Sequence, residues 1–469
     1  MTTKNRTERA LVGVAVDGVL NYVNRDPENR QRSLLYLVDL TQRLAGDLFR
    51  PESYEGAKAL IRENGKWMHY VDRLLDELDP NVIRMTALNL GYQASYLGTK
   101  TIRKRRLLHQ CNVPWLMLLD PTSACNRHCT GCWAAEYGHR LSLTYDELDS
   151  IITQGKELGI YFYMYTGGEP LMRKKDLIRL CEKHSECAFH AFTNGTLLDD
   201  DFCREMQRVG NFSVSVSLEG FEEVNDARRG EGSFREVMEA MDRMKKYGLL
   251  FGTSICYTSK NIDTVTSDAF LDMIIDKGCR YTWYFHYMPV GSDASVELLP
   301  TREQRAYMYR RVREIRAREG GKPIYAMDFQ NDGEFVGGCI AGGRNYLHIN
   351  ANGDVEPCVF IHYSGANIRE CTLLQALKQP LFMAYRDGQP FNDNHLRPCP
   401  MLENPQLLRD MVHRTGAHST DLESPEDVDD LCDRCVPYAE QWKDTADELW
   451  RDNYRVPVGF QNYKADYQK

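Results

Sequence analysis

The sequence predicts an α/β protein: a partial (β/α)6 barrel of the TIM type, with a helical domain before it and a small cysteine-rich domain after it. Between residues 115 and 288, strand-like runs alternate with amphipathic helical runs. This repetition predicts parallel strands joined by right-handed crossovers. The first hundred or so residues show helical spacing of apolar side chains without strand-like alternation. Cysteines recur between residues 339 and 435 and predict a metal-binding module.

We place the domain boundaries where these patterns change, at residues 1–110 for the helical domain, 111–295 for the barrel and 296–469 for the cysteine-rich domain with C-terminal helices. The barrel domain contains six expected strands, at Trp115–Asp120, Tyr161–Tyr165, Ala188–Thr193, Phe212–Leu218, Leu250–Cys256 and Tyr281–Met288. Expected helices between them include Tyr145–Leu158, Lys174–Lys183 and Phe234–Tyr247.

Composition limits the function classes. A chain of 469 residues holds two or three domains. The formal charge of -9 argues against a basic groove for nucleic acid. No run of about 18 apolar residues is present, so no transmembrane segment is expected. The 15 cysteines do not resemble a secreted disulfide scaffold, which favours metal binding in a cytoplasmic enzyme.

Three cysteines follow the first expected strand: Cys125, Cys129 and Cys132, with three residues inside the first gap and two inside the second. Three such thiolates can hold three irons of a cubane cluster and leave the fourth open to another ligand. Zinc is the alternative, but it requires a fourth protein ligand. The only histidine in the loop, His128, is adjacent to Cys129 and therefore poorly placed to share its metal.

A Gly-Gly-Glu-Pro turn follows the second expected strand. Gly167 and Gly168 allow close approach of a ligand to the backbone. Glu169 offers an acceptor for an amine, and Pro170 fixes the turn. In barrels of this type, catalytic groups gather at the carboxyl ends of the strands, so the cysteine loop and this turn should lie together.

Together the cysteine loop and the turn resemble the radical S-adenosylmethionine (SAM) enzymes. The resemblance implies that a [4Fe-4S] cluster on Cys125, Cys129 and Cys132 binds SAM at its open iron. An electron from the cluster then cleaves SAM and leaves a 5′-deoxyadenosyl radical. The electron would come from a reducing partner such as ferredoxin or flavodoxin, and the chemistry is usually anaerobic.

The resemblance also suggests further contacts to SAM. The turn, with Gly167, Gly168 and Glu169, corresponds to the segment that holds the methionyl amine. Asn194 follows the third expected strand, and Ser217 ends the fourth. Arg229 resembles an arginine that meets the carboxylate. One departure is Gly131 before the third cysteine, where many members have an aromatic residue; contact with adenine would pass to Trp133 or to backbone.

The cysteine-rich domain predicts a β-hairpin. Alternating residues at 346–349, a turn at Asn352-Gly353 and Val355 would bring Cys339 and Cys358 together. The segment resembles the SPASM or twitch extension of radical SAM enzymes, which implies one auxiliary [4Fe-4S] cluster. Its expected ligands are Cys339, Cys358, Cys399 and one of Cys432 or Cys435, with Cys432 favoured. A structural zinc is the alternative.

The sequence therefore predicts a radical SAM enzyme that abstracts hydrogen from an unidentified peptide, lipid or small molecule. The apolar N-terminal helices would suit a cap over a hydrophobic substrate chain. The alternative is a non-catalytic iron–sulfur or zinc protein that carries electrons or acts as a scaffold. Such a protein would have no use for the glycine-rich turn or for an open iron.

Overall fold

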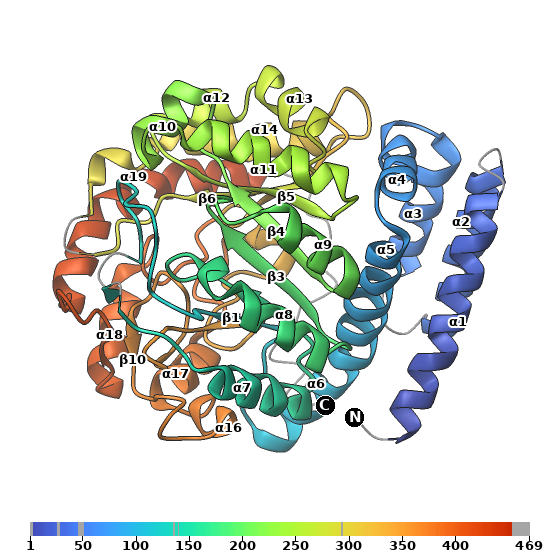
Figure 1. Ribbon diagram of the computed structural model, residues 1–469. Coiled ribbons are helices and arrows are strands. Elements are labelled where there is room, and N and C mark those ends of the chain that lie inside the picture. Colours follow the sequence, from blue (N-terminus) through green and yellow to red (C-terminus); the bar gives the residue numbers. More distant parts are fainter. Residues whose placement is uncertain are drawn as a thin grey trace.

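The computed structural model describes residues 3–25, 29–45, 51–134, 137–138, 140–291 and 294–452. Its centre is a curved nine-stranded sheet that forms an open barrel (Figure 1). The expected ends of the first and third domains, residues 1–2 and 453–469, lie outside the described residues. The domain boundaries themselves stay a prediction.

The six expected strands are present and lie side by side in sequence order. They are β1 Leu116–Leu119, β2 Phe162–Tyr165, β3 Ala188–Thr193, β4 Phe212–Ser217, β5 Phe251–Tyr257 and β6 Tyr281–His286. All neighbouring pairs among them are parallel. This confirms the predicted partial barrel, in which the two edge strands do not meet.

The sheet extends beyond these six strands on both sides. Strand β7, Tyr325–Asp328, adds in parallel to β6. On the other side, β8, Tyr346–Ile349, pairs in parallel with β1, so that Leu116 lies opposite Tyr346. Strand β9, Val355–Glu356, folds back antiparallel onto β8. The predicted hairpin is therefore confirmed, and it is also part of the barrel sheet.

Helices cover the outer face of the sheet. They are α7 Tyr145–Leu158, α8 Lys174–Lys183, α9 Asp200–Val209, α10 Glu222–Arg229, α11 Ser233–Lys246, α12 Ile262–Val265, α13 Asp268–Asp276 and α14 Arg302–Arg316, with 3-10 turns η4 Pro170–Arg173 and η5 Val296–Leu298. Helix α7 shows why these segments are helical. Thr144 and Glu147 form a capping box at its start, and Gly159 ends it in the left-handed conformation.

Alternation along the strands sorts side chains between the two faces of the sheet. Tyr163 and Tyr165 point outward into the core beneath the helices, and the Tyr163 hydroxyl donates to the carbonyls of Ile152 and Ile160. Met164, between them, belongs to a second core inside the barrel. This inner core continues into the cysteine-rich segment, so the barrel lumen and the auxiliary site share one apolar interior.

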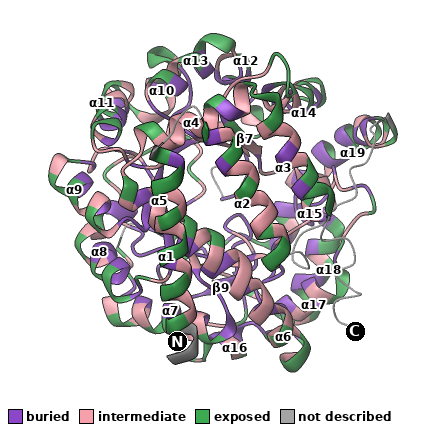
Figure 2. Ribbon diagram, turned by 90° about the vertical axis from the view of Figure 1, so that its right-hand side faces the viewer, coloured by how far each residue is buried: buried purple, intermediate pink, exposed green. Residues whose placement is uncertain are grey.

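The N-terminal helices close the opposite end of the barrel from the cysteine loop. They are α1 Thr3–Arg25, α2 Arg30–Ala45, α3 Pro51–Glu63, α4 Lys66–Glu77, α5 Pro80–Thr86, the π-helical η2 Ala87–Gly98 and α6 Thr99–His109. Figure 2 shows α1, α2 and α5 lying across the ring of outer helices.

Hydrogen bonds fix this placement. The Tyr70 hydroxyl donates to the carbonyl of Arg280, just before β6, and the Asp79 amide donates to Gly248, just before β5. Asn89 donates to the carbonyl of Cys187, just before β3. All three acceptors precede the amino ends of strands. The expectation of a helical cap over the substrate is therefore wrong: these helices form the floor of the barrel.

The C-terminal segment completes the barrel and then packs beside its mouth. Its remaining elements are α15 Gly333–Val336, β10 Tyr363–Ser364, α16 Leu373–Ala376, α17 Pro380–Gly388, α18 Pro405–Thr415, β11 His418–Ser419 and α19 Val428–Asp452. Within the described residues, we find no helix with the length and apolar character needed to cross a membrane.

Candidate active site and auxiliary cysteine site

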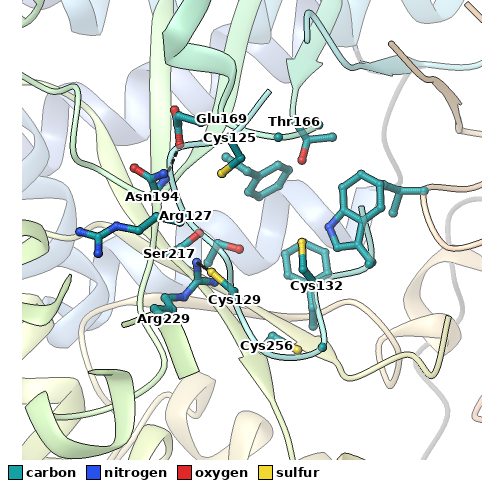
Figure 3. A pocket seen from close by; sticks show the side chains of 18 of the residues that line it. Cys125, Arg127, Cys129, Cys132, Thr166, Glu169, Asn194, Ser217, Arg229 and Cys256 are labelled. Atoms are coloured by element: carbon teal, nitrogen blue, oxygen red, sulfur yellow. Dashed lines mark hydrogen bonds between the residues drawn. The ribbon is translucent and has the colours of Figure 1, made fainter. Parts of the chain in front are cut away.

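The three cysteines of the loop after β1 line one cavity at the carboxyl ends of the strands. Cys125, Cys129 and Cys132 face this cavity together with the Gly-Gly-Glu-Pro turn (Figure 3). The loop is anchored at its start, where the Ser123 amide donates to the carbonyl of Leu141. Burial raises the pKa of Cys125 to about 11, so a metal must displace a proton to bind this thiol.

The glycine turn is bonded directly to the cysteine loop. The Gly168 amide donates to the Thr122 carbonyl at 3.0 Å, and the Glu169 amide donates to Ala124 at 2.8 Å. A Cβ atom on Gly168 would lie 2.3 Å from the Ala124 oxygen, and Gly167 has a φ of +105°. Only glycine fits both positions, so the sequence builds a close-fitting cradle next to the three thiols.

Glu169 holds the turn while keeping capacity for a ligand. Its carboxylate is buried and accepts bonds from the amides of Leu171 and Asn194 and from the Thr193 hydroxyl. A carboxylate has about four acceptor sites, so one remains on the oxygen that accepts from Asn194. Burial raises the pKa of Glu169, although these hydrogen bonds oppose the shift. The remaining site suits an ammonium group.

The other expected SAM contacts lie around the same cavity. Asn194 and Ser217 both line it, at the ends of β3 and β4. The Asn194 side chain donates to Asn126 of the cysteine loop at 2.8 Å, and Asn126 donates to Thr196. Pro170 starts the η4 turn after Glu169. All the expected SAM contacts except Pro170 therefore line one cavity, and their contact with SAM stays a prediction.

Two arginines give the cavity a positive side. Arg229 donates to buried Glu219, and its Nη1 lies 3.8 Å from the Cys129 sulfur. Arg228 also contacts Glu219, at 2.8 Å. Burial lowers the pKa of Arg229, but the charges of Glu219 and Cys129, together with the hydrogen bond to Glu219, outweigh this effect and raise it. Two guanidinium groups share one carboxylate, so one positive charge is left to meet an anionic group such as a carboxylate. The sequence interpretation did not identify Arg228 or Glu219.

Much of the remaining cavity wall is aromatic, with Trp133, Phe192, Phe285, Tyr287 and Phe360. The wall also explains the glycine before the third cysteine: a Cβ atom on Gly131 would lie 2.9 Å from the Tyr287 ring. Tyr287, which directly follows β6, occupies the space that an aromatic side chain at position 131 would fill. Trp133 lines the cavity, as expected for an adenine contact, which stays a prediction.

A buried charged network lies behind Trp133 and was not foreseen. His348 on β8 contacts Asp120 at 2.9 Å and Glu356 at 2.6 Å. Tyr137 donates to Glu356, and Trp133 packs edge-on over the His348 ring at 5.7 Å between centroids. Burial lowers the pKa of His348, but the two carboxylates outweigh it and raise the pKa to about 10. An imidazolium therefore joins the auxiliary hairpin to the cysteine loop.

This network predicts a pH-dependent stability. In the unfolded chain a histidine titrates near 6.5, and in the fold His348 titrates near 10. Its contribution to stability is fully present below pH 6.5 and is lost as the pH rises through 10. We expect the loss of unfolding free energy caused by His348→Gln to be largest near pH 6.5 and to shrink toward pH 10.

Urea unfolding at a series of pH values measures this dependence. His413, an exposed histidine that contacts Asp429, provides the matched control. The His413→Gln variant should cost little unfolding free energy, because exposed ion pairs contribute little to stability. A cost of His348→Gln that stays constant from pH 6.5 to 10 would contradict the assignment of an imidazolium.

The expected auxiliary cysteines gather in the second core. Cys339, Cys358, Cys399, Cys432 and Cys435 all belong to this cluster of side chains. The charges of Cys339 and Cys358 act on the pKa of Cys399, which burial raises well above its ordinary value. Among the described residues, no three His, Cys, Asp or Glu side chains converge on a position for one metal ion. The five thiols supply the four ligands that a cubane iron–sulfur cluster requires.

One orphaned group points into the auxiliary site. The Tyr385 hydroxyl is fully buried without a hydrogen-bond partner. Its pKa is raised by burial and by the charges of four cysteines, which are Cys339, Cys358, Cys399 and Cys432. A buried hydroxyl without a protein partner, in the same core as these cysteines, fits a site that holds an acceptor-rich group. Whether Cys432 or Cys435 is the fourth ligand stays a prediction, with Cys432 favoured.

Two family models match the segments that carry the two cysteine sites. The family model described as the radical SAM superfamily matches residues 119–271, which hold the cysteine loop and the glycine turn. These residues therefore form a radical SAM domain. The model of SPASM, described as an iron-sulfur cluster-binding domain, matches residues 339–401. Cys432 and Cys435 lie beyond that match.

Several radical SAM relatives are similar over about half of the chain. An uncharacterized protein of Archaeoglobus fulgidus is 28% identical over 258 residues, 51% of this chain and 60% of that protein. An AdoMet-dependent heme synthase of Methanosarcina barkeri is 24% identical, over 56% of this chain and 82% of the relative. The mycofactocin maturase MftC of Mycolicibacterium smegmatis is 26% identical, over 53% and 65%.

Solved structures share the fold. SuiB of Streptococcus suis, crystallised with S-adenosylmethionine, is superimposed with a TM-score of 0.53 at 18% identity, over 64% of this chain and 75% of that one. A radical SAM domain followed by a SPASM domain implies a SAM-binding [4Fe-4S] cluster, SAM and an auxiliary iron–sulfur group. The glycine cradle beside three thiols and the orphaned Tyr385 hydroxyl fit these cofactors.

Proposed function

We propose that the protein reductively cleaves SAM and uses the resulting radical to remove hydrogen from a substrate held in the barrel mouth. When bound, the [4Fe-4S] cluster and SAM supply a 5′-deoxyadenosyl radical. The observation that carries this proposal is the contact between the glycine cradle and the three-cysteine loop, where Gly168 lies against the Ala124 carbonyl. An electron carrier has no need of such a cradle.

The chain's own residues would bind and orient SAM. Glu169 offers its remaining acceptor site to the methionyl ammonium, because its other acceptor sites are occupied by the protein. The uncompensated charge of Arg228 and Arg229 faces the carboxylate. Trp133 and the backbone of 288–291 form the wall expected to meet adenine, since Met288 also lines the cavity.

The wall of the cavity indicates the kind of group that reacts. Phe192 and Phe285 pack 5.6 Å apart between centroids, and both line the cavity with Phe360. We propose that the reacting part of the substrate is apolar or aromatic, because these rings offer no charged partner. Relatives named heme synthase, PqqA peptide cyclase and mycofactocin maturase leave peptides and small molecules as candidates.

We also propose that a reducing partner such as ferredoxin or flavodoxin supplies the electron. The reaction is proposed to be anaerobic and to take place in the cytoplasm. The direct experiment is anaerobic reconstitution with iron and sulfide, followed by SAM and dithionite. Formation of 5′-deoxyadenosine supports catalysis. An intact cluster that gives no 5′-deoxyadenosine would support the non-catalytic carrier instead.

We further propose one auxiliary [4Fe-4S] cluster on Cys339, Cys358, Cys399 and Cys432. The variant Cys358→Ala should lower the iron content by about four atoms per chain, because it removes one of the four thiolates proposed to hold the cubane. Iron and sulfide analysis measures this loss. As a control, Cys435→Ala should keep the full iron content. Unchanged iron in Cys358→Ala would remove the auxiliary site from the proposal.

A further inference from the structure

Two buried tyrosines flank the auxiliary cysteines from different elements. Tyr346 begins β8, and its hydroxyl donates a hydrogen bond to the Cys358 sulfur. Tyr385 lies on α17, and its buried hydroxyl has no hydrogen-bond partner. Neither tyrosine is part of a cysteine motif, and nothing in the sequence spacing links them.

The fold makes room for Tyr385 at a specific place. Gly342 follows Cys339 by three residues and has a φ of +63°, and a Cβ atom there would lie 2.5 Å from Cβ of Tyr385. The glycine therefore lets the tyrosine approach the loop that carries the first cysteine. A phenol that is fully buried without an acceptor is costly, so this placement needs an acceptor that the protein atoms do not provide.

We propose that both hydroxyls donate hydrogen bonds to sulfur atoms of the auxiliary cluster and thereby raise its reduction potential. Tyr346 donates to the Cys358 thiolate, and Tyr385 donates to a sulfide or thiolate on its side of the site. This inference rests on the proposed auxiliary cluster. Hydrogen bonds to cluster sulfurs stabilise the more negative, reduced state, which raises the potential.

Tyr346 also connects the auxiliary site to the active-site cavity. Its ring contacts Phe329 at 6.0 Å between centroids, and Phe329 contacts Phe285 at 5.4 Å. Phe285 lines the active-site cavity. A continuous row of rings therefore leads from the substrate position to the Cys358 side of the auxiliary site. A higher potential on that side makes the auxiliary cluster a better electron acceptor for the cavity.

The test isolates the auxiliary cluster in the full chain. In a background with Cys125, Cys129 and Cys132 all changed to alanine, the auxiliary cluster alone contributes an EPR signal. We expect Tyr346→Phe and Tyr385→Phe each to lower the ratio of reduced to oxidised cluster, at fixed potential, by about tenfold, which corresponds to a shift of 59 mV for one electron. Iron content should stay unchanged, and the double variant should shift further.

The control removes a buried hydroxyl elsewhere. Tyr163 is equally buried, but its hydroxyl bonds backbone carbonyls under α7, so Tyr163→Phe should leave the potential unchanged. If both test variants have the same potential as this control, the inference is overturned. The proposal of an auxiliary cluster is not affected by that result. Loss of iron from either variant would also overturn it, by assigning a structural role. A background protein without iron would reject the auxiliary cluster itself.

Discussion

Cys129→Ala should abolish the cleavage of SAM. Cys129 lines the cavity, and Arg229 lies 3.8 Å from its sulfur. With only two thiolates left in the loop, the cluster loses one of its three protein ligands. Mutating a residue that only hydrogen-bonds to a metal ligand typically lowers metal affinity or activity by about 10–100-fold. Removing a ligand itself should therefore lower SAM cleavage by more than about 100-fold. The measurement is 5′-deoxyadenosine formed per chain under dithionite.

The control for this prediction is another half-buried cysteine. Cys371 donates to the Asn367 carbonyl and is absent from the cavity wall, so Cys371→Ala should cleave SAM at the parental rate. The iron of the auxiliary site should remain in both variants. Parental activity in Cys129→Ala would mean that the three-cysteine loop does not hold the reactive cluster.

Gly168→Ala should disable the same site without touching a cysteine. The added methyl group would lie 2.3 Å from the Ala124 carbonyl and 2.4 Å from that of Ser123, so either the turn or the cysteine loop must move. A displacement of about 1 Å in a catalytic site costs on the order of 100-fold in rate. We expect SAM cleavage to fall by about this factor while the cluster iron is retained.

A matched substitution separates this clash from a general effect of alanine. Gly56 lies within α3, and a Cβ atom there has no neighbour within 4 Å. Gly56→Ala should keep full activity and raise stability by up to about 1 kcal/mol, because alanine favours helix. Parental SAM cleavage by Gly168→Ala would show that the turn does not contact the bound cofactor.

Most of the confirmed predictions of the fold rest on local sequence motifs. The strands, the hairpin and the relation between cysteine loop and glycine turn follow from short patterns, because each depends on residues close in sequence. Helix α7 is predicted at its observed bounds, since its capping box and C-terminal glycine are both local signals. The cavity-lining cysteines and Glu169 were likewise found from their motifs.

Long-range pairing was not predictable in the same way. The buried charged network joins residues more than two hundred positions apart, and no sequence motif contains them. Its members are Asp120, Tyr137, His348 and Glu356. The floor position of the N-terminal helices depends on bonds such as that from Asn89 to the Cys187 carbonyl. Helical spacing predicts that a helix is amphipathic, but it does not say which end of a barrel it covers.

The parallel pairing of β8 with β1 has a consequence for electron transfer. Cys125 follows β1, and β8 belongs to the hairpin that leads to Cys358, so the two redox centres would be mounted on adjacent strands of one sheet. Their separation would be set by backbone hydrogen bonds and not by a hinge between domains. Tunnelling between them would then proceed at a fixed distance through every turnover, without waiting for domain closure.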